Sequence, residues 1–192
     1  MTDVSAPRQA GITHPANLLT IARLIFAPLL FWFVLDAEAD RGASWAGFAL
    51  GVALASTDFF DGKVARRANV VSRSGAFLDP LADKVVILGS AICLVSVNRY
   101  WWLPVSIIAV REIGITVWRS RWARSGLSLP ARKSAKYKTF VQGLALSMAV
   151  MPSLNDQDTL LAAMLWLAVG WTVFSGGQYL LDGQKALNTT GA

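Results

Sequence analysis

Four aspartates stand in a short segment between two strongly apolar stretches. Asp58 and Asp61 are three residues apart, and Asp79 and Asp83 are four residues apart. On a helix, either spacing places both side chains of a pair on one face. Carboxylate oxygens from two such helices are ligands that hard divalent cations such as Mg²⁺ prefer. Residues 56–86 contain no Cys or His, so the pattern predicts a divalent-metal site and disfavours zinc.

Two glycines and an arginine accompany the carboxylates. Gly62 directly follows the first pair, and Gly75 precedes the second. A residue without a side chain lets a ligand approach the backbone closely. Arg66 can hold a phosphate through two parallel hydrogen bonds. A solvated loop with scattered charges is the alternative interpretation, but the paired spacing favours a site for metal ions and phosphate.

The elements that carry these residues are strongly apolar. The chain has 192 residues, of which 54% are hydrophobic and 16% are charged, against about 25% charged residues in a typical soluble domain. Several apolar runs approach the roughly 20 residues that a membrane-spanning helix needs. Pro80 indicates that the third run begins as a helix near residues 77–79, or bends there. We therefore expect an all-α integral membrane protein with six transmembrane helices, at residues 17–35, 43–60, 79–98, 101–120, 136–152 and 159–181.

The charges of the linkers predict the topology. The linkers at 36–41, 98–99 and 153–158 carry few basic residues, whereas 61–78 and 119–138 are rich in Lys and Arg. Basic linkers stay on the cytoplasmic side of a membrane, which places both termini and the aspartates there. The net charge of +6 and the pI of about 9.9 follow from this bias, so no nucleic-acid partner is expected. The predicted organisation is a cytoplasmic segment at 1–16, a six-helix domain at 17–182 and a short tail at 183–192.

The aspartate segment resembles the signature of the CDP-alcohol phosphotransferases. It reads Asp58-x-x-Asp61-Gly62-x-x-Ala65-Arg66, then eight residues, then Gly75-x-x-x-Asp79-x-x-x-Asp83, with each fixed position of that signature present. The resemblance implies two divalent ions, Mg²⁺ or Mn²⁺, that hold the pyrophosphate of a CDP-linked lipid. An alcohol then attacks the phosphorus next to the lipid, and CMP leaves.

The resemblance also implies roles for individual residues. It makes Asp58, Asp61 and Asp79 metal ligands, and Asp83 the general base on the acceptor hydroxyl as well as a further metal ligand. It places Gly62, Arg66 and Gly75 along the CDP moiety. Separately from the resemblance, Asn17 and Thr20 open the first predicted span and either cap that helix or contact the nucleotide or the acceptor; we assign both to CDP-lipid binding.

Basic residues that follow the aspartate segment indicate what kind of acceptor alcohol could bind. Arg111 lies about ten residues into the fourth predicted span, and a charge at that depth is a functional candidate. Its neighbour Glu112 is expected to point about 100° away around the helix; a local ion pair between them is the alternative. We expect a pocket for an anionic, phosphorylated acceptor rather than choline or ethanolamine, formed by Arg111, Arg119, Lys136 and Lys138.

Three flanking segments also resemble the bacterial phosphatidylglycerophosphate synthases. They are residues 17–23, 111–116 and 136–139. This resemblance implies a homodimeric, multi-pass enzyme of the cell membrane that joins CDP-diacylglycerol and sn-glycerol 3-phosphate, giving phosphatidylglycerol phosphate and CMP. Inositol phosphate, or phosphatidylglycerol in cardiolipin synthesis, are alternative acceptors. A divalent-cation transporter would instead need aspartates near the middle of its spans, and a non-enzymatic scaffold would leave the carboxylates without a purpose.

Overall fold

The computed structural model describes the backbone of residues 15–68, 73–124 and 133–190, and the side chains of 20–56, 80–121 and 137–184. The described residues form helices and no strand, which confirms the all-α class. The helices are α1 (Pro15–Asp36), α2 (Trp45–Ala68), α3 (Arg73–Ser96), α4 (Trp102–Arg124), α5 (Lys133–Val150) and α6 (Asp158–Thr190), with short 3₁₀ helices at Glu38–Asp40 and Pro152–Leu154.

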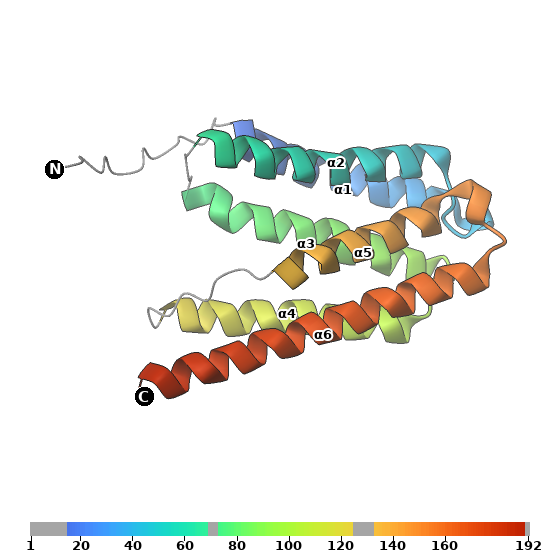
Figure 1. Cartoon of the computed structure of the whole chain (residues 1–192). Coiled ribbons are helices and arrows are strands. Elements are labelled where there is room, and N and C mark those ends of the chain that lie inside the picture. Colours follow the sequence, from blue (N-terminus) through green and yellow to red (C-terminus); the bar gives the residue numbers. More distant parts are fainter. Residues whose placement is uncertain (1–14, 69–72, 125–132, 191–192) are drawn as a thin grey trace.

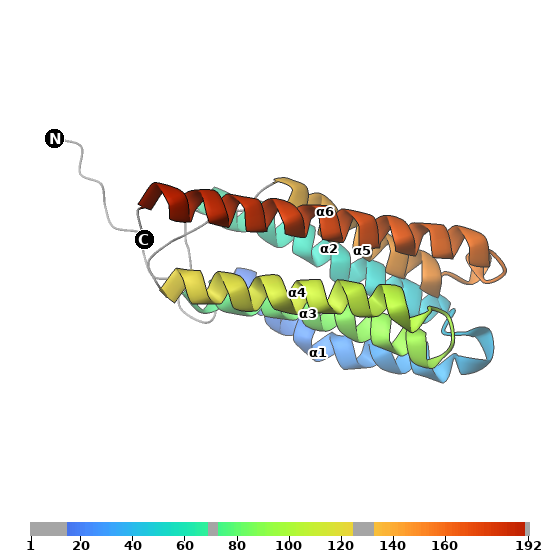
Figure 2. The same ribbon diagram turned by 90° about the horizontal axis from the view of Figure 1, so that it is seen from below.

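The helices form an elongated bundle in which the chain runs back and forth along one axis (Figures 1 and 2). Helix α1 packs against α2 and α3, α4 against α3 and α6, and α5 against α2, α3 and α6. Helices α2 and α4 end, and α3 and α5 begin, toward the same end of the bundle, where α1 also begins and α6 ends (Figure 1). We call this the motif end, because it holds the aspartate-bearing ends of α2 and α3, and the other the far end.

Several helices are longer than the predicted spans. Helix α2 continues to Ala68, α3 begins at Arg73 with Pro80 inside it, and α6 continues to Thr190. The prediction that α3 begins near residues 77–79 is therefore wrong. Hydropathy marks only the apolar part of a helix, whereas helical hydrogen bonds connect backbone groups and continue through polar residues.

The buried side chains differ between the two ends. The apolar core is built from the later parts of α1, α3 and α5 and the earlier parts of α4 and α6, which lie toward the far end. Most buried polar side chains come instead from the middle of the bundle and from segments nearer the motif end. The core includes Val34, Leu94, Val97, Ile108, Ala149, Leu161 and Leu165, and these buried polar residues include Thr20, Arg23, Glu112, Lys138, Gln142, Thr172 and Ser175.

Two arginines stabilise the connections between helices at the far end. Arg99, between α3 and α4, is buried and donates to the carbonyl oxygens of Ala149 at 3.1 Å, Leu154 at 3.1 Å and Asn155 at 2.7 Å. Arg41, between α1 and α2, also donates to the Asn155 carbonyl at 2.7 Å. Helix ends leave carbonyl groups without helical partners, and these guanidinium groups satisfy several of them.

A tyrosine beside Arg99 adds a further link. Burial raises the pKa of Tyr100 above its ordinary range, so its hydroxyl stays protonated. That hydroxyl donates to the carbonyl oxygen of Ala145 on α5 at 2.7 Å. The Tyr100 hydroxyl therefore remains a donor to α5 at the far end.

The outer surface of the bundle is rich in exposed apolar side chains. An exterior with this many exposed apolar side chains is unusual for a soluble domain and agrees with contact to lipid. By length and composition, Asp158–Gln184 is the segment of the described residues that can cross a membrane, and Trp45–Ser56 is a shorter apolar stretch. The exposed apolar residues include Ile25, Trp32, Ile92, Val110, Phe140 and Leu181.

Candidate functional site

The two aspartate pairs lie on helices, as their spacing predicts. Asp58 and Asp61 belong to α2, and Asp79 and Asp83 belong to α3. These parts of α2 and α3 lie toward the motif end (Figure 1). All four residues offer carboxylate oxygens, a donor set that fits a hard divalent cation. Among the described side chains there is no group of three or more possible metal ligands. The side chains of Asn17, Asp58, Asp61, Gly62, Arg66, Gly75, Asp79 and Lys136 lie outside the described residues.

Asp83 has an arginine partner that the sequence did not suggest. The Arg23 guanidinium of α1 forms an ion pair with Asp83 Oδ1 of α3. The Arg23 side chain is only 3% exposed, whereas that of Asp83 is 34% exposed. The Arg23 guanidinium places a positive charge next to the Asp83 carboxylate. Asp83 is therefore oriented from one side and accessible from another.

Thr20 lies one turn before Arg23 and is completely buried. Because α1 begins at Pro15, Thr20 stands inside the helix, and the interpretation of Thr20 as its N-cap is wrong. The sequence placed the helix start at residue 17, since the apolar run begins there. Asn17 lies in the first turn of α1.

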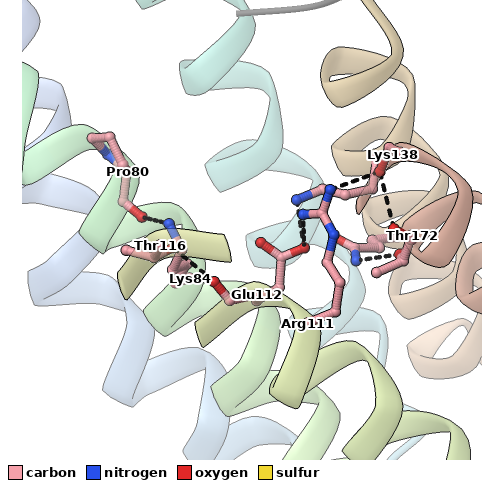
Figure 3. Close-up of polar contacts among 9 residues, drawn as sticks. Pro80, Lys84, Arg111, Glu112, Thr116, Lys138 and Thr172 are labelled. Atoms are coloured by element: carbon pink, nitrogen blue, oxygen red, sulfur yellow. Dashed lines mark hydrogen bonds and ion pairs between the residues drawn. The ribbon is translucent and has the colours of Figure 1, made fainter. Parts of the chain in front are cut away.

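A second group of polar residues brings together α4, α5 and α6. Glu112 Oε1 accepts hydrogen bonds from Arg111 Nη1 at 3.1 Å and from Lys138 Nζ at 2.5 Å (Figure 3). Arg111 Nη2 donates to Ser175 Oγ at 2.8 Å. We call Arg111, Glu112, Lys138 and Ser175 the acceptor cluster. With two positive charges and one negative charge, it leaves a net positive charge inside an apolar bundle.

The contacts in the acceptor cluster differ from one expectation drawn from the sequence and agree with another. Arg111 and Glu112 were expected to diverge, but their side chains form an ion pair. Their Cβ atoms do point in different directions, yet both side chains are long enough to meet where Lys138 enters from α5. Arg111 and Lys138 share Glu112 Oε1 as their partner, so two residues predicted for one pocket lie together. The sequence did not single out Glu112 as a site residue, although a carboxylate inside an apolar span was a signal for it.

Further hydrogen bonds lie next to the acceptor cluster. Gln142 Nε2 on α5 donates to Thr172 Oγ1 on α6 at 2.8 Å. Ser175 Oγ donates to the Thr172 carbonyl at 3.0 Å. On the other side, Thr116 Oγ1 donates to the backbone carbonyl of Glu112 at 2.7 Å (Figure 3). Since Gln142 and Thr172 are buried, the hydrogen bond between them links α5 to α6 beside the cluster.

Arg119, also predicted for the acceptor pocket, lies further along α4. It is exposed, and its guanidinium carbon lies 5.7 Å from the centre of the Tyr179 ring. Eight residues of helix place Arg119 about 12 Å from Arg111 along the axis, toward the motif end. The two arginines therefore lie at different levels along the bundle axis, and Arg119 is the nearer of the two to the motif end.

Comparisons with known proteins point in one direction. Residues 13–174 match the family model described as CDP-alcohol phosphatidyltransferase. The chain is 36% identical over 178 residues to a "Probable phosphatidylglycerophosphate synthase" of Mycobacterium tuberculosis, covering 90% of this chain and 82% of that protein. It is 32% identical to proteins named "CDP-diacylglycerol--glycerol-3-phosphate 3-phosphatidyltransferase" from Rickettsia typhi, over 85% of this chain and 93% of the relative, and from Bacillus subtilis, over 91% and 97%.

Proposed function

This chain belongs to the CDP-alcohol phosphatidyltransferase family, and on that premise we propose that it transfers a phosphatidyl group from CDP-diacylglycerol to sn-glycerol 3-phosphate. The products are phosphatidylglycerol phosphate and CMP. The family makes the chain a transferase of phospholipid biosynthesis, and the names of its relatives support this acceptor. The structural observation that carries the acceptor assignment is the pair of cations in the acceptor cluster, Arg111 and Lys138, whose side chains are 12% and 10% exposed.

The acceptor cluster suits a phosphorylated alcohol. Arg111 and Lys138 approach one carboxylate oxygen from different helices, so their donor groups lie close together. A phosphate group can accept hydrogen bonds from both cations, and such charge-assisted bonds are about twice as strong as neutral ones. A neutral alcohol would gain nothing from this net charge. In this proposal Lys136 and Arg119 extend the positive charge from the cluster toward the motif end.

The bond exchange takes place at the phosphorus next to the diacylglycerol. The hydroxyl oxygen of glycerol 3-phosphate forms a bond to that phosphorus, and the bond from phosphorus to the CMP oxygen breaks. Asp83 accepts the proton of the attacking hydroxyl, and CMP leaves with the bonding electron pair. The exposed part of Asp83 supports this role, since a general base must reach the hydroxyl. The ion pair with Arg23 holds the carboxylate in place.

The family generally uses divalent metal ions. We assign two Mg²⁺ or Mn²⁺ ions to Asp58, Asp61, Asp79 and Asp83, because this donor set contains only carboxylates. Bound ions would neutralise the pyrophosphate and stabilise charge on the attacking and leaving oxygens. Residues assigned to the CDP-lipid are Asn17, Thr20, Gly62, Arg66 and Gly75.

We place the enzyme across the cell membrane with six spans and with its active site facing the cytoplasm. The alternating direction of α1 to α6 supports this topology, as do the apolar exterior and the gathering of aspartate-bearing helix ends at the motif end. In this proposed topology both termini are cytoplasmic, because α1 begins and α6 ends at the motif end. A homodimer is the proposed assembly.

An acceptor assay tests the proposal. The purified enzyme in detergent receives CDP-diacylglycerol and Mg²⁺ with sn-glycerol 3-phosphate, inositol phosphate or phosphatidylglycerol in separate reactions, and CMP release is measured. We expect release with sn-glycerol 3-phosphate, loss of release on chelation, and recovery when Mg²⁺ or Mn²⁺ is restored. Release with inositol phosphate alone would make the acceptor assignment wrong. Full activity in a chelator would overturn the metal assignment.

A further inference from the structure

Arg111 lies against two neighbouring residues of α6. Its Nη2 donates to Ser175 Oγ at 2.8 Å. A Cβ added to Gly176 would lie 3.0 Å from Arg111 Nε and 3.3 Å from Arg111 Cγ. We propose that Ser175 and Gly176 form a seat on α6 that positions Arg111 for the phosphate of the acceptor. This inference rests on the proposed function, and it makes both α6 residues positioning residues for acceptor binding.

Glu112 and the seat hold the guanidinium from two sides. Glu112 Oε1 accepts from Nη1, and Ser175 Oγ accepts from Nη2. Ser175 is itself completely buried, and its hydroxyl donates to the Thr172 carbonyl at 3.0 Å, which orients the oxygen toward Arg111. A planar guanidinium held at both terminal nitrogens keeps one orientation. It can then meet a phosphate without first losing rotational freedom, and such pre-organisation favours productive binding.

The contact with Arg111 explains why a glycine stands at position 176. Glycine inside a helix is less stable than alanine, and Gly176 has no positive φ angle that would require it. The missing side chain instead makes room for the middle of the Arg111 side chain. Gly177 is different, because a Cβ there would meet nothing within 4 Å. The family match ends at residue 174, so both seat residues lie beyond the matched segment.

The adjacent glycines provide a matched pair of variants. Gly176→Ala and Gly177→Ala make the same change on the same helix, but only the first meets Arg111. In the full-length enzyme, we expect Gly176→Ala to raise the KM for sn-glycerol 3-phosphate about three- to tenfold, the range for one weakened hydrogen bond. The KM for CDP-diacylglycerol should stay unchanged, and Gly177→Ala should match the unmodified enzyme for both substrates. Equal acceptor KM values in the two variants, or an equal rise for both substrates, would overturn the seat.

Two further variants complete the experiment. Ser175→Ala removes a hydroxyl without adding bulk, so it should fold even if Gly176→Ala does not, and it should raise the same acceptor KM. Arg111→Ala tests the acceptor cluster separately from the seat. An unchanged acceptor KM in Arg111→Ala would refute both the acceptor cluster and the seat. A raised KM in Arg111→Ala with normal values in Ser175→Ala and Gly176→Ala would refute the seat alone.

Discussion

Lys138 Nζ on α5 lies 2.5 Å from Glu112 Oε1 on α4, and both side chains are about nine-tenths buried. The same oxygen accepts from Arg111, so one carboxylate compensates two cations. Charges interact more strongly away from water, and each member of this group therefore depends on the others. The group also links α4 to α5, two helices that both pack against α6 and α3.

A double-mutant cycle tests this dependence. Glu112→Ala leaves Arg111 and Lys138 without a counter-charge, so we expect it to lower the free energy of unfolding by about 3–5 kcal/mol. Lys138→Ala should cost less, because Glu112 keeps Arg111. The double variant should be less destabilised than the sum of the single variants, with a coupling of about 0.5–3 kcal/mol. Denaturation in detergent measures all three, and additive losses would contradict the shared carboxylate.

Asp83→Asn tests the proposed base. The amide oxygen can still accept from Arg23, so the protein should fold, but it cannot take the proton of the acceptor. We expect kcat to fall by about a hundredfold or more in the CMP-release assay. Asp40→Asn, in the 3₁₀ helix at the far end, makes the same change away from the site and should leave kcat unchanged. Near-normal turnover in Asp83→Asn would remove Asp83 as the base.

Arg99→Met tests how much the hydrogen bonds of Arg99 stabilise the far end of the bundle. It removes a charged donor from three carbonyl groups, and we expect a loss of roughly 3 kcal/mol in unfolding free energy. Arg41→Met is the control, because the Arg41 side chain is 37% exposed. Its ion pair with Asp158 is exposed to solvent, so it should contribute much less to stability than the buried contacts of Arg99. Thermal unfolding measures both, and equal losses would show that burial of Arg99 is unimportant.

Gly89→Ala tests the close approach of α1 and α3. A Cβ on Gly89 would collide with the ring of Phe31, so we expect destabilisation of about 1–3 kcal/mol from overpacking. Gly114→Ala on α4 adds the same atom in open space and should be neutral or slightly stabilising in a monomer. Thermal unfolding compares the two, and an unchanged midpoint for Gly89→Ala would show that α1 can shift at no cost.

Much of the site could be predicted because its chemistry is local in sequence. The aspartate pairs depend on helical spacing within α2 and α3, and the structure places both pairs on helices. Arg111 and Lys138 could be proposed as partners from their charge and depth alone. The helix ends were less predictable, since apolar runs stop where the membrane would stop and helices do not.

The sequence by itself determined the all-α class, the segments rich in chemistry and the family, because these depend on residue type and spacing along one helix. Only the tertiary structure decided which groups meet across helices. Arg23 pairs with Asp83 from 60 residues away, Lys138 shares Glu112 with Arg111, and Ser175 holds Arg111 from α6. Such contacts depend on how helices pack and rotate against one another, and neither periodicity nor charge within a single segment specifies that rotation.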